Sequence, residues 1–169
     1  MKKSCLVLPL IIIAIACSNT KQTTKIEVAS GISITLPQLP DKIKKDSTNI
    51  FYLWKTSFDD DQFAIYKYPV TISDSSGFEI RKTVFRKTID AFVQTFTSKK
   101  IDSTYLFKDN NFQCNLSFDF VQDNDDYRFF GRFLVKKNYF IAFCFQTPFP
   151  VDRSSKRIKD ELFNAIELK

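Results

Sequence analysis

The chain has 169 residues, of which 44% are hydrophobic and 26% are charged, and its formal net charge is +6. These values are typical of a globular chain with one core. It contains no histidine, which excludes Ser-His-Asp and Cys-His nucleophile pairs and removes the commonest ligand of zinc and copper. Because Gly31, Gly77 and Gly131 stand alone, no glycine-rich phosphate-binding loop exists and nucleotide-dependent enzymes are excluded.

The first sixteen residues have the parts of an export signal in the usual order. Basic residues follow Met1, an apolar run extends from Leu6 to Ala16, and Ala14-Ile15-Ala16 forms a small-residue cleavage pattern. The run is interrupted by Pro9 and is shorter than the roughly 20 residues of a membrane-spanning helix. We therefore predict a signal peptide at residues 1–16, with an uncleaved membrane helix as the alternative.

At Cys17 the segment resembles the lipobox of bacterial lipoproteins. That resemblance implies that the Cys17 thiol is joined to diacylglycerol and that the new amino terminus is acylated, as with palmitate. It also implies anchoring to the inner or outer membrane, facing the periplasm or the cell surface. Ala14 stands where the motif usually has Leu, so cleavage after Ala16 without lipidation is the alternative. Residues 17–25 are polar and predict a lipidated tether, followed by one domain over residues 26–169.

The charge balance argues against nucleic acid as a partner. The 25 basic residues fall to 23 when Lys2 and Lys3 leave with the signal, against 19 acidic residues, and they are spread along the chain. We expect the membrane and an envelope protein as partners, no nucleic acid and no cofactor.

The first half of the domain predicts a strand, a loop and a hairpin. Gly31 to Pro37 alternates apolar and polar residues, as a half-buried strand does, and the basic run Lys42 to Lys45 then favours a loop. Asn49–Phe58 and Gln62–Tyr68 are rich in aromatic and β-branched residues, and the acidic turn Asp59-Asp60-Asp61 between them indicates a hairpin.

A long helix is predicted next. Its apolar residues recur mostly every three or four positions, at Phe78, Ile80, Val84, Phe85, Ile89, Phe92, Val93 and Phe96. The remaining positions carry charges, at Glu79, Arg81, Lys82, Arg86, Lys87 and Asp90. We interpret these charges as a solvated face, and a basic patch for a partner is the alternative.

The second half returns to period two. Four strands joined by short polar turns predict an antiparallel meander, over Ile101–Phe107, Phe112–Val121, Tyr127–Val135 and Tyr139–Thr147. A final helix capped by Ser154 or Ser155 has an apolar stripe at Ile158, Leu162, Phe163 and Ile166. The fold class is α+β: a single antiparallel sheet of about six or seven strands with one long helix and a C-terminal helix packed on it.

Element order carries a second resemblance. The Gly31-to-Pro37 opening, the helix after an early hairpin, the meander and the closing segment Leu162 to Leu168 together resemble the PsbP-like family of photosystem II extrinsic proteins. The resemblance spans residues 26–169. It implies an adaptor or assembly role and lends no catalytic residue.

Cys114 and Cys144 form the remaining cysteine pair after Cys5 and Cys17 are assigned to the leader and the lipid. In a meander their strands lie roughly 9 to 10 Å apart, which is too far for a bridge. We favour buried free thiols, and a disulfide in an oxidising compartment is the alternative.

The hairpin aromatics include two candidate interaction residues, Tyr52 and Trp54. Strict alternation cannot bury all of the hairpin's rings on one face, so some lie on a second face. A sheet covered on both sides would make them core, whereas an exposed pair would form a platform for a hydrophobic or carbohydrate partner.

Acidic residues give weaker signals. Asp123-Asn124-Asp125-Asp126 offers oxygen ligands for calcium but lacks the glycine and distal glutamate of a calcium loop. Asp119, Glu79 and Glu161 are the carboxylates that a hydrolase would use, although their spacing does not bring two together.

Two short segments, Asp46-Ser47-Thr48 and Asp102-Ser103-Thr104, resemble the O-glycosylation motif of Bacteroidetes and hint at such a source.

The sequence thus predicts a lipid-anchored binding or assembly module of the cell envelope with no catalytic activity. A carrier with a hydrophobic ligand between sheet and helices, or a carboxylate-dependent hydrolase, are the alternatives.

Overall fold

The computed structural model describes residues 23–37, 40–45, 50–55, 60–70, 76–96, 98–108, 111–136 and 138–169. The expected signal peptide, Cys17 and the Asp46-Ser47-Thr48 segment lie outside these residues. In chain order the elements are β1 (Thr24–Ala29), β2 (Ile32–Leu36), β3 (Lys42–Lys45), β4 (Ile50–Lys55), β5 (Gln62–Pro69), α1 (Phe78–Val93), β6 (Ser98–Lys108), β7 (Asn111–Gln122), β8 (Asp125–Lys136), β9 (Tyr139–Pro148), α2 (Arg153–Asn164) and β10 (Ile166–Leu168).

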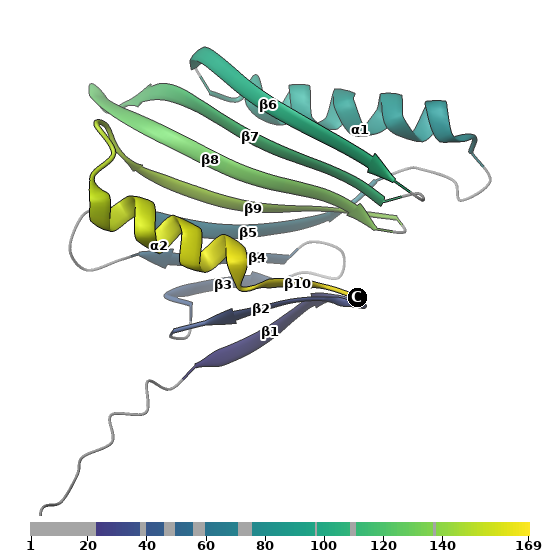
Figure 1. Cartoon of the computed structure of the whole chain (residues 1–169), viewed down its shortest axis with the longest axis horizontal. Coiled ribbons are helices and arrows are strands. Elements are labelled where there is room, and N and C mark those ends of the chain that lie inside the picture. The colour runs from purple at the N-terminus through teal and green to yellow at the C-terminus, as the bar shows by residue number, and fades with distance from the viewer. Residues whose placement is uncertain are drawn as a thin grey trace, which may run out of the picture.

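The strands form two antiparallel sheets, which confirms the α+β class (Figure 1). The larger sheet has seven strands in the order β3-β4-β5-β9-β8-β7-β6, and it contains the expected hairpin and the expected meander. The smaller sheet, in the order β1-β2-β10, was not expected. Its first strand begins at Thr24, inside the range expected to be tether, and its last strand uses Ile166, which was expected to continue the final helix.

On one face of the seven-stranded sheet, α1 closes a core made mostly of phenylalanine rings. Phe85, Ile89 and Val93 are the buried apolar residues of the helix. The Phe85 ring lies 5.9 to 6.4 Å from four rings on three strands, those of Tyr105, Phe107, Phe112 and Phe140. We call this side the α1 face.

Charges on α1 are less solvated than the helical pattern predicted. Arg81 is only 7% exposed, and its guanidinium lies 5.4 Å from the centre of the Phe112 ring. Arg86 lies at similar distances over Tyr105 and Phe107. The expectation of a fully solvated face was therefore wrong for Arg81, because a guanidinium packs favourably on an aromatic ring.

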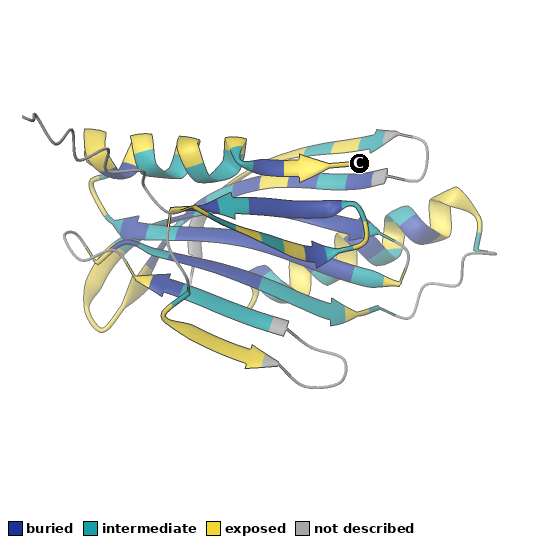
Figure 2. Ribbon diagram, turned by 90° about the horizontal axis from the view of Figure 1, so that it is seen from below, coloured by how far each residue is buried: buried dark blue, intermediate teal, exposed yellow. Residues whose placement is uncertain are grey.

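The opposite face is covered by the three-stranded sheet and α2, and we call it the α2 face (Figure 1). Ile34 and Leu36 of β2 pack there with buried residues of β5 and β9, including Phe63 and Phe143. The central strands are thus buried on both faces, as the dark strands of Figure 2 show. The aromatic residues of the β4–β5 hairpin are shared between the two layers.

Two boundaries differ from the sequence prediction. Helix α2 is capped by Asp152, whose carboxylate accepts a hydrogen bond from the Ser155 amide at 2.7 Å. Ser155 does not cap the helix, because its hydroxyl donates instead to the buried carboxylate of Asp61 at 3.0 Å. The segment Lys42–Lys45, expected as a loop, forms the edge strand β3, which Figure 2 shows exposed along its described side chains. Lysine-rich edges discourage pairing with other chains.

The cysteine prediction is confirmed: Cys114 and Cys144 are buried free thiols. They lie on β7 and β9, which are separated by β8 in the sheet order. That separation is too large for a disulfide.

Within the described part of the chain, no helix combines the length and apolar character needed to cross a membrane.

Candidate functional site

The α2 face of the large sheet is only partly covered, and the uncovered part is a groove. Helix α2 and β10 lie over β8 and β9, whereas β6 and the outward side chains of β7 have no element above them among the described residues. Two neighbouring hollows lie on this part of the sheet, and we call them together the α2–β10 groove. Its wall is α2 and β10, and its floor is β6, β7 and β8.

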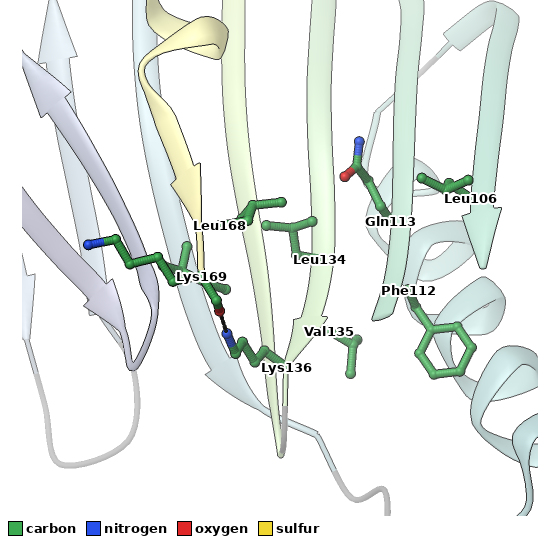
Figure 3. Close-up of a pocket in the computed structure, with 9 residues that line it drawn as sticks. Leu106, Phe112, Gln113, Leu134, Val135, Lys136, Leu168 and Lys169 are labelled. Atoms are coloured by element: carbon green, nitrogen blue, oxygen red, sulfur yellow. Dashed lines mark hydrogen bonds between the residues drawn. The ribbon is translucent and has the colours of Figure 1, made fainter. Parts of the chain in front are cut away.

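The end of the groove beside β10 is mainly apolar and encloses about 260 Å³. Figure 3 shows Leu168, Leu134, Gln113 and Leu106 following one another across this end, each from a different strand. Leu106 and Leu168 are 57% and 52% exposed, and both line this hollow. This end therefore offers an apolar seat that the chain itself leaves open.

The end beside α2 is polar and wider, with a volume of about 530 Å³. Its floor carries hydroxyl and amide side chains together with one guanidinium, from Thr104, Asn115, Ser117 and Arg132, and its wall includes Lys159 and Asn164. Lys159 forms an ion pair with Asp160 at 2.6 Å. These groups both donate and accept hydrogen bonds, so this end suits a polar backbone or side chain.

Two basic side chains of β8 fasten the wall to the floor. Arg132 donates to the Phe163 carbonyl at 2.9 Å and to the Asn115 side-chain oxygen at 3.1 Å. The Phe163 carbonyl is in the last turn of α2, where carbonyls lack helical partners. Burial lowers the pKa of Arg132, although its guanidinium stays charged at neutral pH. At the other end, Lys136 donates to the Lys169 backbone oxygen at 2.5 Å (Figure 3).

The edge of β10 opens into the same groove. β10 pairs with β2 on one side, and it ends the order of the three-stranded sheet. The Ala165 carbonyl accepts from the Thr35 amide of β2, and the Lys169 amide donates to the carbonyl of Gly31, which directly precedes β2. Because bonding directions alternate along an antiparallel strand, the peptide groups of Ile166 and Leu168 point to the other side. No described strand pairs with them.

Solved structures share this architecture. The solution structure of cyanobacterial PsbP (CyanoP) from Synechocystis sp. PCC 6803 matches with a TM-score of 0.55 and 12% identity, covering 90% of this chain and 96% of that chain. The crystal structure of LpqN, involved in cell envelope biogenesis of Mycobacterium tuberculosis, matches with a TM-score of 0.50 and 10% identity, covering 88% and 91%. The chain shares their fold. No family model and no curated protein matches the sequence.

The likeness confirms the expected PsbP-like fold and shows the fold alone, because identities near 10% carry no residue roles. The groove is therefore defined by this chain's own residues.

The hairpin does not form the exposed aromatic platform that was the alternative to a core role for its rings. Trp54 is only 5% exposed, and its ring lies 5.6 Å from that of Phe63 on the α2 face. Tyr52 is half-buried and stacks on Trp54 at 5.9 Å. A platform that exposes Trp54 was thus the wrong reading of the hairpin, because both sheet faces are covered there. An interaction role for the pair stays a prediction.

The structure does not bring the candidate hydrolase carboxylates together. Asp119 on β7 forms a two-bond ion pair with Arg128 of β8. Glu79 is on α1, on the opposite side of the sheet, and Glu161 on α2 pairs with Arg157 at 3.5 Å. A glycosidase needs two carboxylates facing one cleft, an arrangement that these three residues do not form.

The remaining candidates have structural roles where they are described. Asp123 and Asn124 have positive φ values of 54° and 72°, as a tight two-residue hairpin between β7 and β8 requires. Among the described residues, no group of three or more His, Cys, Asp or Glu side chains is arranged to hold a metal ion. Asp102-Ser103-Thr104 lies exposed on the edge strand β6.

Burial also removes the cysteines as nucleophiles. It raises the pKa of the Cys114 thiol to about 11 and raises the pKa of Cys144 as well. Both thiols are therefore protonated at neutral pH, and the thiolate is the reactive form.

Sequence reasoning missed the groove although one signal was present. Polar residues alternate with core residues along β7, at Gln113, Asn115, Ser117 and Asp119. Such alternation indicates that one face of the strand is open to solvent. It does not say which element borders that face.

Proposed function

We propose that the chain is a lipid-anchored, non-catalytic binding or assembly module of the cell envelope that holds its partner in the α2–β10 groove. The observation that carries this proposal is the groove's composition, which combines an open apolar seat with hydrogen-bonding groups. A binding surface needs these features, and an active site needs converging catalytic groups in addition.

The comparisons support the envelope setting. LpqN, which shares the fold, is described as involved in cell envelope biogenesis. An envelope role also agrees with the export signal and the lipobox-like Cys17. The anchor would hold the groove close to other membrane-bound proteins, which raises their effective concentration.

Labelling with radioactive palmitate tests the anchor. The wild-type protein is expected to incorporate label and to partition with membranes, and a Cys17→Ser variant is expected to do neither. Equal labelling of the two proteins would remove Cys17 as the lipidation site.

Site-directed photo-cross-linking tests the groove as a binding surface. A photoreactive amino acid at Leu106, on the groove floor, is expected to give a discrete adduct with an envelope component in intact cells. The matched control is Ile80 on α1, which is equally exposed at 60% and lies on the other side of the sheet. Adducts that are identical from both positions, or absent from Leu106, would count against the proposal.

A carrier function is less well supported. Between α1 and the sheet the aromatic rings pack closely, and the apolar hollow between α1 and the end of β5 is open at the surface rather than enclosed. The apolar end of the groove is smaller than the roughly 300 to 1,000 Å³ of typical ligand pockets. Native mass spectrometry that finds a co-purified lipid would nevertheless favour the carrier function.

A further inference from the structure

We infer that the groove binds an extended acidic segment of a partner polypeptide, which adds a strand to the open edge of β10. The inference rests on the proposed binding function and specifies the partner's chemistry. Three observations carry it: a free strand edge, an apolar seat of side-chain size, and an excess of positive charge.

The free edge supplies backbone hydrogen bonds. The peptide groups of Ile166 and Leu168 point away from β2 and toward the side where the groove lies. Strand addition to such an edge is an established mode of peptide recognition, in which backbone bonds give affinity and alternate side chains give specificity. An incoming strand would therefore extend the three-stranded sheet over the floor of the groove.

The apolar seat predicts the size and character of one side chain of the incoming strand. At about 260 Å³ the cavity lined by Leu106, Leu134 and Leu168 accommodates one or two side chains rather than a drug-sized ligand. Because alternate residues of a strand point to the same face, the apolar residue that fills the seat would face the floor together with the residues two positions before and after it.

The charges that line the groove predict which residues flank this apolar side chain in the bound segment. The groove is lined by basic side chains at Arg132, Lys136, Lys159 and Lys169, whereas Asp102 and Asp160 are its acidic residues among those described. Lys159 and Asp160 pair with each other, so the balance is positive. Arg132 and Lys136 make the bonds described above and still have donors to spare, since guanidinium has five and ammonium three.

The spacing of the side chains on β8 predicts a sequence motif for the bound segment. Arg132, Leu134 and Lys136 occupy every second position and share one face of the strand. The bonds from Arg132 to Phe163 and from Lys136 to Lys169 show that β10 runs along β8 in the same sense. A segment beside β10 would meet the three side chains in turn. The matching motif is acidic, any residue, apolar, any residue, acidic.

Selection from a random peptide library tests the motif. Full-length protein purified in detergent would be panned with displayed dodecapeptides, and a Leu106→Glu variant would be used for counter-selection. We expect enriched peptides with the acidic-x-apolar-x-acidic pattern that bind at least tenfold more weakly to Leu106→Glu and unchanged to Ile80→Glu. Enrichment of basic, proline-rich or unpatterned peptides, or no enrichment, would overturn the inference.

A pair of variants at Leu168 tests the strand addition itself. Leu168→Ala removes the side chain and keeps the outward amide, whereas Leu168→Pro removes both, and proline is tolerated at a strand edge. We expect the proline variant to bind an enriched peptide about fivefold more weakly than the alanine variant, as the loss of one hydrogen bond predicts. Equal affinities, with thermal melting unchanged in both variants, would exclude pairing at this edge.

Failure here is distinguishable from failure of the proposed function. If photo-cross-linking from Leu106 captures an envelope protein while no peptide binds, the binding function stands and the extended-segment inference is wrong.

Discussion

Both faces of the seven-stranded sheet are closed over apolar cores, but the covering of the α2 face is also tied down by polar side chains. On the α1 face, rings from α1 pack on the strands β5, β6, β7, β8 and β9. The single ring of Phe92, for example, lies within about 6 Å of the rings of Tyr66, Phe129 and Phe133. On the α2 face, Ile166 of β10 is buried in the core and Leu162 of α2 packs against that core. The same segment is bonded near its ends by Arg132 and Lys136.

The α2–β10 groove lies where the covering of the α2 face ends. The free energy of apolar burial is proportional to the area removed from water, so it favours closing the gaps under α1, although a mainly apolar surface hollow remains between α1 and the end of β5. A hydrogen bond fixes one point and leaves the surface beside it open. The α2 face can therefore combine a stable covering near β9 with an unfilled floor near β6.

Truncation of Phe85 is the strongest test of the closed face. Phe85 is fully buried and lies near four rings, so Phe85→Ala should lower the free energy of unfolding by about 3 to 5 kcal/mol. Urea unfolding followed by circular dichroism measures the loss. Ile80→Ala on the same helix, 60% exposed, is the control and should cost less than about 1 kcal/mol. Similar losses from both variants would contradict the packing described for α1.

Alkaline pH should weaken the same face through its thiols. Burial raises the Cys114 pKa from 9.0 to about 11, so the unfolded chain loses this proton first. The contribution of the protonated Cys114 thiol to the free energy of unfolding is complete below pH 9. It is lost progressively as pH rises toward 11, by roughly 1.4 kcal/mol for each pH unit. The free energy of unfolding, measured at several pH values between 8 and 11, should therefore fall less steeply with pH for Cys114→Ala than for wild type. Parallel curves would show that the buried thiol is not the cause.

Gly131 tests how tightly the rings fill this face. A Cβ at this position would lie 2.5 Å from the Phe133 ring and 2.8 Å from the Phe129 ring. Overpacking of this kind costs roughly 1 to 3 kcal/mol, so Gly131→Ala should destabilise by about that amount. Combining it with Phe133→Leu should recover part of the loss relative to the sum of the single variants. Strict additivity would mean that the two positions do not collide.

Much of the fold follows from local pattern. The alternation along β6 to β9 and the three- and four-residue spacing of α1 are set by side-chain burial on each element, so the elements were predictable one at a time. The second sheet was not, because β10 is three residues long and depends on pairing with β2, far away in sequence. Its residues alone, Ile166 to Leu168, continue a helical stripe equally well.

The groove could not be predicted for a related reason. Its lining combines residues of β6, β7, β8, α2 and β10, and only the tertiary arrangement places Leu106 opposite Leu168. The aromatic hairpin had the stronger local signal, so the site was predicted at Trp54. In the structure Trp54 is buried by packing. Conversely, the free thiols were predictable, since the meander separates Cys114 from Cys144 by one strand.

The cap of α2 tests the polar attachment of the open face. Asp152 accepts a hydrogen bond from the Ser155 amide, and losing an N-cap costs about 1 kcal/mol, so Asp152→Ala should destabilise by that amount. Asp152→Asn keeps an equivalent acceptor and should unfold close to wild type. If the asparagine variant is as unstable as the alanine variant, the helix is held by something other than this cap.

Substitution of Leu106 should have the smallest effect on stability and tests most directly whether the α2 face is open where the α1 face is packed. Its side chain is 57% exposed on the groove floor, so Leu106→Ala should change the free energy of unfolding by less than about 0.5 kcal/mol. The same variant removes part of the apolar seat, so an enriched peptide should bind it more weakly. Calorimetric unfolding and peptide titration on one sample measure both quantities. A large loss of stability would mean that Leu106 is core like the α1 face, and that the groove is not an open surface kept for a partner.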